Sequence, residues 1–398
     1  METEGSDWHR AISVLSALLI ILIGTFGICG NFLSIYIFIQ KSMRSSISVF
    51  ICGLCVSNTM LILVSFAAFV VQGLSMIATN ESIETYIAYV PVTSYPIAMI
   101  MHSVSLWLLV AITVERFVVV KWPLLARKLC TVTRAVIALI CIWAMSIGYN
   151  SVRFLEYELV PSPFANRTVP LVRQRLRNNA TYFNVYFVSL FLVTHFLVPF
   201  VLLVVLNLKT VLQIKRVRAD TRRVSPTVYS EHRVALMMSV VTGCFILCNT
   251  IPILLNILEA FNQQFFFSAK TYTVAYLLLD LNNCLVVLSA SVDVVIYYSF
   301  CSRYRATLLH MVLPSLKWRK SVYKGLYVAA ATPACYGGRS TTLSTDTKRT
   351  TMITESPTTD LTLPAQSREQ IANGSLQRCD NEKRSTGRSA NMEYLNAL

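Results

Sequence analysis

"SASVDVVIY", residues Ser289 to Tyr297, contains an aspartate inside a run that has no other charge. The run extends from Leu281 to Ser302, which is long enough to cross the hydrocarbon core of a membrane as a helix. A carboxylate at the centre of a bilayer costs about 2.5 to 3.5 kcal/mol on insertion scales, so Asp293 is expected to face a polar partner inside a helix bundle. The stretch therefore indicates a helical membrane protein with a polar interior.

The whole chain has the composition of a membrane protein. Of its 398 residues, 55% are hydrophobic and only 14% are charged, and the charges are clustered. Long gaps separate the clusters, and each can supply the roughly 20 apolar residues that a spanning helix needs. The seven gaps are 11–40, 45–80, 85–114, 135–152, 178–208, 234–258 and 271–302, the last broken only by Asp280 and Asp293. We therefore predict an all-α membrane protein, a seven-transmembrane helix bundle. The first helix is expected to be retained, because it is about twice as long as the apolar part of a signal peptide.

The Lys/Arg content of the segments between the helices predicts the orientation. Segment 41–44 has two such residues, 115–134 has five and 209–233 has seven, whereas 72–102, taken as an outer loop, has none. Because cytoplasmic loops carry the excess of Lys and Arg, the N-terminus is expected outside and the C-terminus in the cytoplasm. Segment 153–177 is an exception, since it is expected outside and yet has five arginines.

Glycosylation sequons bear on this conflict. Asn80, Asn166 and Asn179 each begin an N-x-S/T sequence on the side predicted to be external. Asn373 also begins one, but it lies near the C-terminus and is expected to stay unmodified. The agreement between sequons and charge count favours a multi-pass protein of the plasma membrane with its N-terminus outside.

The remaining composition excludes several classes of protein. The net charge of +15 is explained by basic cytoplasmic segments that face anionic lipid headgroups. No basic region alternates with stacking aromatics, so nucleic acid is not an expected partner. The eleven cysteines fall in predicted helices or on the cytoplasmic side, so no external disulfide is expected, and Cys52 and Cys55 are expected to pack rather than bind metal. No phosphate loop, HExxH or serine-elbow motif is present, so we do not expect an enzyme.

One motif at the cytoplasmic end of the third predicted helix resembles that of a known receptor family. The segment "ITVERFVVVKWPL" (Ile112 to Leu124) has an acid next to an arginine, Glu115 and Arg116, followed by an apolar run and a proline. It resembles the E/D-R-Y/F motif of rhodopsin-like (class A) G-protein-coupled receptors. Other landmarks of that family occur in the required order along the chain: Asn31 in "GICGN", Trp143, Pro199, Pro252 and Tyr297 at the end of "DVVIY".

Longer strings resemble segments of invertebrate FMRFamide-peptide receptors. They are "SLWLLVAITVERF", "YNSVRFLEYE" (Tyr149 to Glu158), "LCNTIPILLNILE" (Leu247 to Glu259) and "LNNCLVVLSASVDVVIYYSF". The resemblance covers residues 11 to about 312 and implies a neuropeptide receptor, of FMRFamide-like (RF-amide) type, that activates heterotrimeric G proteins. A chemosensory receptor for a small molecule is one alternative. A seven-helix channel or transporter is another, although the chain lacks the internal repeat of many transporters.

The resemblance also implies a division of the chain. Residues 1–10 are expected to be a short extracellular N-terminus, and 11–312 the receptor domain, which ends in a short amphipathic cytoplasmic helix after helix seven. Residues 313–398 are rich in Ser and Thr and poor in apolar residues, so we expect a disordered cytoplasmic tail. Phosphorylation of that tail by a receptor kinase would supply the clustered negative charge that an arrestin binds.

Three departures from the family pattern concern the lid over the pocket and the activation relay. The cysteine usually found 25 residues before Arg116 is Pro91, so no disulfide is expected to hold the second external loop. The tryptophan expected two residues before the helix-six proline is Thr250, and the helix-seven proline is Val294. We therefore expect an altered relay.

The family pattern suggests a partner for the intramembrane aspartate. That pattern has Asp on helix two and Asn on helix seven, whereas this chain has Asn58 and Asp293, the same two groups exchanged. Ser289 lies four residues before Asp293 and so shares its helix face. Asn31 and Ser105 fall where the family has the rest of this polar cluster, which is expected to hold water or sodium. The alternative is a lone buried aspartate that is neutralised by protonation.

The ligand class is narrowed by residues that are absent. By resemblance, an amine receptor carries Asp where this chain has Ala98, and an opsin carries Lys where it has Val287. A ligand that enters between the helices is expected to meet nine residues at the pocket mouth: Tyr95, Met99, His102, Tyr182, Tyr186, Asn256, Glu259, Tyr276 and Asp280. The two carboxylates suit the arginine of an RF-amide peptide, because a guanidinium and a carboxylate form paired hydrogen bonds. For the aromatic residues and His102, plain helix packing is the alternative.

The cytoplasmic switch is implied by the same resemblance. Glu115, Arg116 and Tyr297 are expected to form it, and helix six is expected to bend at Pro252. A ligand that favours the state with helix six swung outward would free Arg116 from Glu115 and open a cleft for the G protein.

Overall fold

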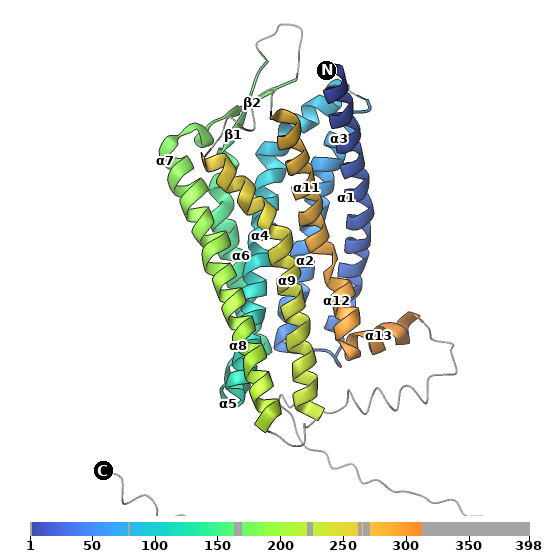
Figure 1. The fold of residues 1–398 in the computed structure, drawn as a ribbon, viewed down its shortest axis with the longest axis vertical. Helices are drawn as coiled ribbons and strands as arrows, with labels where there is room; N and C mark the ends of the chain where they lie inside the picture. The colour runs from blue at the N-terminus through green and yellow to red at the C-terminus, as the bar shows by residue number, and fades with distance from the viewer. Residues whose placement is uncertain are drawn as a thin grey trace, which may run out of the picture. The chain divides into compact units, whose positions relative to one another are not determined.

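A computed structural model describes most of the region predicted to form the bundle. The described residues are 2–78, 80–162, 169–220, 226–261, 265 and 271–312. They all lie in the unit formed by residues 1–338. Asn166 and the predicted tail 313–398 lie outside the described residues. Within the described part, seven helices are long and apolar enough to cross a membrane, which confirms the predicted all-α bundle (Figure 1).

The first three spans lie close to their predicted ranges. The first is α1 (Glu2–Ile39). The second consists of α2 (Ser46–Ser65), a π-helical turn η1 (Phe66–Val70) and α3 (Val71–Ser75). The third is α4 (Glu81–Lys121), and the short α5 (Pro123–Leu129) follows it.

The fourth and fifth spans are joined by a loop that contains strands. The fourth span is α6 (Val132–Asn150) with the 3-10 turn η2 (Ser151–Leu155). The loop contains β1 (Tyr157–Val160), β2 (Leu171–Gln174) and the 3-10 turn η3 (Leu176–Asn178). The fifth span consists of α7 (Ala180–Tyr182), the π-helical η4 (Phe183–Leu190) and η5 (Leu192–Leu197), and α8 (Val198–Asp220).

The sixth and seventh spans are followed by a short helix. The sixth span is α9 (Pro226–Phe261), with Pro252 inside it. The seventh span consists of α11 (Tyr272–Ser291) and α12 (Asp293–Phe300), which are separated at Val292. The short α13 (Ser302–Val312) follows.

Polar side chains cap the beginnings of the second, third and fourth spans. The side chains of Ser45, Asn80 and Thr131 each accept a hydrogen bond from the backbone N–H three residues on, at 3.3, 2.9 and 3.4 Å. The Lys/Arg count takes 72–102 as an outer loop, and the cap at Asn80 corrects this assignment, because the third span begins there, close to its predicted start at residue 85. In the structure α3 ends at Ser75 and α4 begins at Glu81, so most of that segment is helical.

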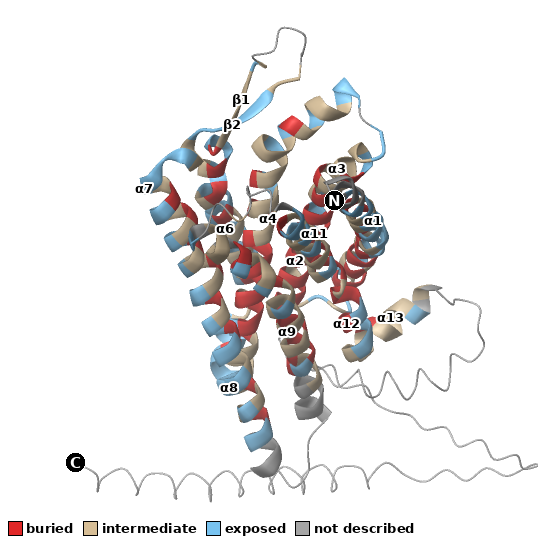
Figure 2. Ribbon diagram, turned by 45° about the horizontal axis from the view of Figure 1, so that its top comes forward, coloured by how far each residue is buried: buried red, intermediate tan, exposed pale blue. Residues whose placement is uncertain are grey.

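Burial distinguishes the inside of the bundle from its outer surface. Figure 2 shows buried residues concentrated between the helices and exposed residues on their outer faces. Little of the apolar part of the fourth and fifth spans is buried, which is expected for helices that contact lipid. Two glycines let α1 lie close to the seventh span, since a Cβ on Gly30 would meet Val294 Cγ1 at 2.5 Å and one on Gly27 would overlap Ser291. This close approach helps to fix the position of Asp293.

The two ends of the bundle differ in structure. At one end, β1 and β2 pair antiparallel, with Tyr157 opposite Gln174 and Val160 opposite Leu171 (Figure 1). We call this the hairpin end; the N-terminus of α4 lies at the same end. At the opposite end lies α13, where the Tyr304 hydroxyl is 3.0 Å from the Ser34 hydroxyl of α1. We call it the α13 end.

Candidate functional site

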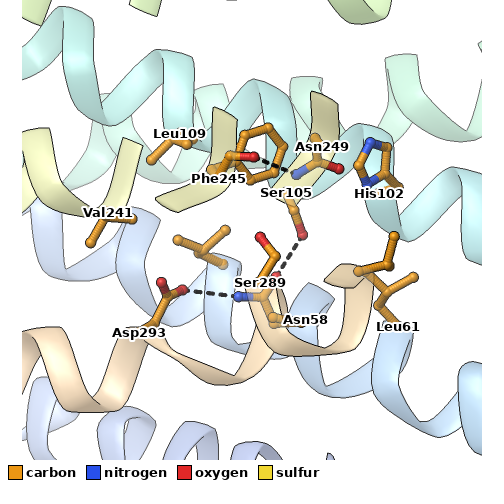
Figure 3. Close-up of a pocket in the computed structure, with 13 residues that line it drawn as sticks. Asn58, Leu61, His102, Ser105, Leu109, Val241, Phe245, Asn249, Ser289 and Asp293 are labelled. Atoms are coloured by element: carbon orange, nitrogen blue, oxygen red, sulfur yellow. Dashed lines mark hydrogen bonds between the residues drawn. The ribbon is translucent and has the colours of Figure 1, made fainter. Parts of the chain in front are cut away.

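The intramembrane aspartate forms a polar cluster with the second and third spans. Asn58 Nδ2 donates to Asp293 Oδ2 at 3.0 Å, and Ser105 Oγ donates to Asn58 Oδ1 at 2.9 Å (Figure 3). The hydroxyl of Ser105 also lies 2.9 Å from that of Ser57. All four residues are buried. The structure therefore places Asn58 and Asp293 in direct contact and connects α2, α4 and α12 in one hydrogen-bonded chain.

The other two residues expected in this cluster have different positions. Ser289 lines the same cavity as Asn58, Ser105 and Asp293 (Figure 3). Asn31 donates instead to the Ala290 backbone carbonyl at 3.1 Å, so it binds the seventh span through the main chain. The cavity is narrow, with room for about one water molecule. Its lining includes a carboxylate and hydroxyl oxygens, the donor type that a hard cation such as sodium binds.

Residues of the predicted cytoplasmic switch lie toward the α13 end. Glu115 is buried, and its Oε2 accepts a hydrogen bond from Ser46 Oγ at 3.0 Å, which joins α4 to the first turn of α2. Arg116, the next residue, is half-buried. Tyr297 is buried, with its ring edge-on to Phe38 at 5.5 Å between centroids. The acid of the motif thus has a partner on another helix.

A second buried cluster, at the hairpin end, contains charged residues. Arg153 and Glu156 have side-chain exposures of 1% and 0%, and Arg153 Nη1 lies 3.2 Å from Glu156 Oε1. Arg153 also donates to Tyr95 Oη at 2.8 Å and to Asn150 Oδ1 at 3.1 Å. Tyr182 Oη donates to Glu156 Oε1 at 2.6 Å. Arg153 therefore connects the end of the fourth span with the third, and Glu156 connects it with the fifth.

Arg177 joins this cluster to the sixth span. Its side chain is 10% exposed, its Nη1 lies 3.6 Å from Glu156 Oε2, and its Nη2 donates to Glu259 Oε1 of α9. The guanidinium carbon lies 4.1 Å from the ring centroid of Phe187 and 5.7 Å from that of Tyr157. Burial raises the pKa of the Tyr157 phenol, so this ring stays neutral beside the guanidinium. We call Arg153, Glu156, Arg177 and Glu259 the ion-pair cluster.

Several residues predicted at the pocket mouth contact this cluster or stack beside it. Tyr95 and Tyr182 bind it through their hydroxyls. Tyr186 stacks on Tyr182 at 5.0 Å between ring centroids, and its hydroxyl donates to the Tyr149 carbonyl at 2.5 Å. Met99 is half-buried on α4. The structure thus brings Tyr95, Tyr182, Tyr186 and Glu259 to one region.

Two other predicted pocket residues, His102 and Asp280, have contacts elsewhere in the bundle. His102 stacks on Phe245 at 5.9 Å and lines the cavity of Asn58 and Asp293 (Figure 3). Asp280 Oδ2 accepts from Ser13 Oγ of α1 at 3.1 Å, so this carboxylate contacts the first span. Tyr276 is half-buried. The side chain of Asn256 lies outside the described residues.

Sequence reasoning missed the roles of Arg153, Glu156 and Arg177. The signal was present, since the excess of arginine in 153–177 conflicts with the orientation rule. Arg153 is buried and Arg177 is 10% exposed, and both pair with carboxylates, whereas Arg173, with 67% of its side chain exposed, pairs with Glu158 on the hairpin.

The chain matches the model of the family 7 transmembrane receptor (rhodopsin family) over residues 30–297. This match covers more than half of the chain, and the seven spans agree with it. The protein therefore belongs to the rhodopsin family of seven-transmembrane receptors, which bind a ligand and act on G proteins, and it is not an enzyme.

Particular relatives narrow the class. The FMRFamide peptide receptor frpr-18 of Caenorhabditis elegans is 34% identical over 302 residues, which are 75% of this chain and 69% of that protein. The FMRFamide receptor of Drosophila melanogaster is 33% identical over 299 residues, 73% of this chain and 52% of that protein, so the chain spans about half of its length. The probable G-protein coupled receptor frpr-1 of Caenorhabditis elegans is 26% identical over 332 residues, 79% of this chain and 82% of that protein. The resemblance to FMRFamide-peptide receptors is confirmed.

Proposed function

We propose that the protein is a plasma-membrane receptor for an amidated neuropeptide of the FMRFamide (RF-amide) type. The similarity to two proteins named as FMRFamide receptors supports this function. The observation that carries it is the position of Glu259, whose carboxylate binds an arginine guanidinium at the hairpin end of α9. An RF-amide peptide presents the same group next to its last residue.

The proposed orientation has the hairpin end outside and the α13 end in the cytoplasm. Asn80 and Asn179 are exposed, and each begins a sequon near the hairpin end of its span. The Lys/Arg-rich segments 115–134 and 209–233 lie at the ends of spans that point the other way. In this orientation the peptide enters between the helices from the outside.

The proposed mechanism is a shift between two helix arrangements. The peptide favours the arrangement in which α9 bends outward about Pro252, because it contacts Glu259 at the hairpin end of the same helix. The Asn58–Asp293 contact rearranges between the two ends, and Arg116 then faces a cleft open to a G protein. Phosphorylation of 313–398 by a receptor kinase recruits an arrestin.

A peptide screen tests this function. Cells that express the receptor and a G protein of broad specificity are exposed to a panel of amidated neuropeptides, and nucleotide exchange is measured. We expect exchange that depends on an RF-amide peptide. A response to small molecules alone would contradict the peptide assignment. Membrane currents without any exchange would instead indicate a channel or transporter.

A further inference from the structure

The ion-pair cluster has the composition of a complete binding site for a guanidinium group. Carboxylates from two separate elements, Glu156 after η2 and Glu259 near the end of α9, approach the same guanidinium. The ring of Phe187 lies 4.1 Å from its central carbon, within the range of a cation–π contact. Such a site binds a guanidinium group, which is planar and can bridge two carboxylates, better than it binds an ammonium group, which is a compact point charge.

The group that fills this site belongs to a loop rather than to a helix of the bundle. Arg177 lies in η3, a turn of three residues between the hairpin and the fifth span. Two neighbouring arginines of the loop, Arg173 and Arg175, have 67% and 64% of their side chains exposed. The segment 153–177 has no cysteine, so no disulfide of its own holds Arg177 in the site.

Charge balance shows what the site requires when Arg177 leaves it. With Arg177 present, the cluster has two cations and two carboxylates, and its formal charge is zero. Without Arg177 the charge is −1: Glu156 keeps its pair with Arg153, whereas Glu259, with 26% of its side chain exposed, loses the pair with Arg177. Removal of one partner from a largely buried ion pair is unfavourable. The vacated site therefore favours another cation.

We infer that Arg177 is a built-in competitor for the site that binds the arginine of the ligand. In the ligand-free receptor it occupies the guanidinium site of Glu156, Glu259, Phe187 and Tyr157, and an arriving arginine displaces it. This inference rests on the proposed function, because it concerns the same ligand. One consequence concerns the apparent affinity for the ligand. It equals the intrinsic affinity multiplied by the fraction of receptors in which Arg177 has left the site.

A free arginine derivative tests the site without any knowledge of the peptide. Purified wild-type receptor, Arg177→Gln and Arg173→Gln are heated with and without L-argininamide at millimolar concentration. We expect argininamide to raise the Tm of Arg177→Gln by a few degrees and to leave the other two nearly unchanged. The neutral analogue citrullinamide should have no effect. Equal shifts in all three proteins, or no shift in Arg177→Gln, would overturn the inference. If Arg177→Gln does not fold, Arg177→Lys replaces it, and argininamide should raise the Tm of this variant too. The reason is that an ammonium group bridges the two carboxylates less well than a guanidinium does.

Peptide binding supplies the second measurement. FMRFamide should bind to Arg177→Gln about tenfold more tightly than to the wild type, whereas Arg173→Gln should match the wild type. A peptide with citrulline in place of arginine should gain nothing from the substitution. Equal or weaker binding of FMRFamide to Arg177→Gln would overturn the inference. If no variant binds any amidated peptide, the proposed function fails, and the argininamide measurement still decides whether this guanidinium site exists.

Discussion

Asn58 of α2 donates a hydrogen bond to the carboxylate of Asp293 at the start of α12, across 3.0 Å. The two residues are 235 positions apart in the chain, and both are buried. The family pattern has the same two groups on the opposite helices. The contact therefore preserves one carboxylate and one amide in the middle of the membrane, with the donor and acceptor exchanged.

A double variant with Asp at position 58 and Asn at position 293 is expected to restore the signalling that each single substitution removes. Asn58→Asp puts two carboxylates in one buried site, and Asp293→Asn leaves two amides and no charge, so both should signal poorly. The double variant should recover much of the signalling. Nucleotide exchange in the four receptors should give a coupling free energy of about 0.5 to 3 kcal/mol. A double variant as impaired as the sum of the singles would show that the pair does not act as a unit.

Loss of the arginine of the cytoplasmic motif should uncouple binding from signalling. Arg116→Ala is expected to abolish nucleotide exchange and to leave surface expression and peptide binding close to the wild type, because the residue lies far from the hairpin end. Arg173→Ala, at the hairpin end, serves as the control and should signal normally. Normal exchange by Arg116→Ala would remove this residue from the switch.

The effect of the Glu259 carboxylate on potency should depend on Arg177. In the Arg177→Gln receptor, Glu259→Gln is expected to raise the peptide concentration for half response about tenfold, because one charge-assisted pair is lost. In the wild type the increase should be smaller, since the same change also weakens the competing Arg177 contact. Asp280→Asn provides a comparison, and its effect should be below that of Glu259→Gln because Asp280 contacts Ser13 of α1. Equal effects of Glu259→Gln in both backgrounds would argue against competition.

Two acids on either side of Tyr157 should differ in their contribution to stability. Glu156→Gln removes the only carboxylate that the described structure pairs with the buried Arg153, so the free energy of unfolding should fall by about 3 to 5 kcal/mol. Glu158→Gln breaks a pair with the exposed Arg173 and should change it by less than about 1 kcal/mol. Thermal unfolding of the detergent-solubilised receptors measures the two effects, and the larger loss of stability should appear as the larger decrease in Tm. Similar shifts for the two variants would contradict the assigned difference in burial.

Glycosylation tests the proposed orientation. The Asn80 and Asn179 side chains are exposed, and each caps a helix through Oδ1, which leaves Nδ2 available for a glycan. We expect glycosidase treatment to reduce the apparent mass of the wild type, and Asn80→Gln and Asn179→Gln each to remove part of that change. Asn373→Gln is the control and should have no effect. A glycan on Asn373 would indicate the opposite orientation, with the C-terminus outside.

The membrane class, the seven spans and the family were determined by the sequence alone. A spanning helix needs its apolar length and its internal backbone hydrogen bonds whatever it packs against, so each span could be recognised locally. The resemblance to the receptor family also pointed to Asn58 and Asp293 as partners. The boundary of the third span was less predictable, because 72–102 has no Lys or Arg and the cap at Asn80 decided where the helix begins.

The partners of the charged residues at the hairpin end were decided only by the tertiary structure. Arg177 and Glu259 are 82 positions apart, and their contact depends on the path of the loop and on the packing of α9, neither of which follows from residue spacing. The same holds for Asp280, which was expected with Glu259 at the pocket mouth and contacts Ser13 of α1. Sequence periodicity gives the face of a helix on which a side chain lies, whereas the neighbour of that face depends on how all seven helices pack together.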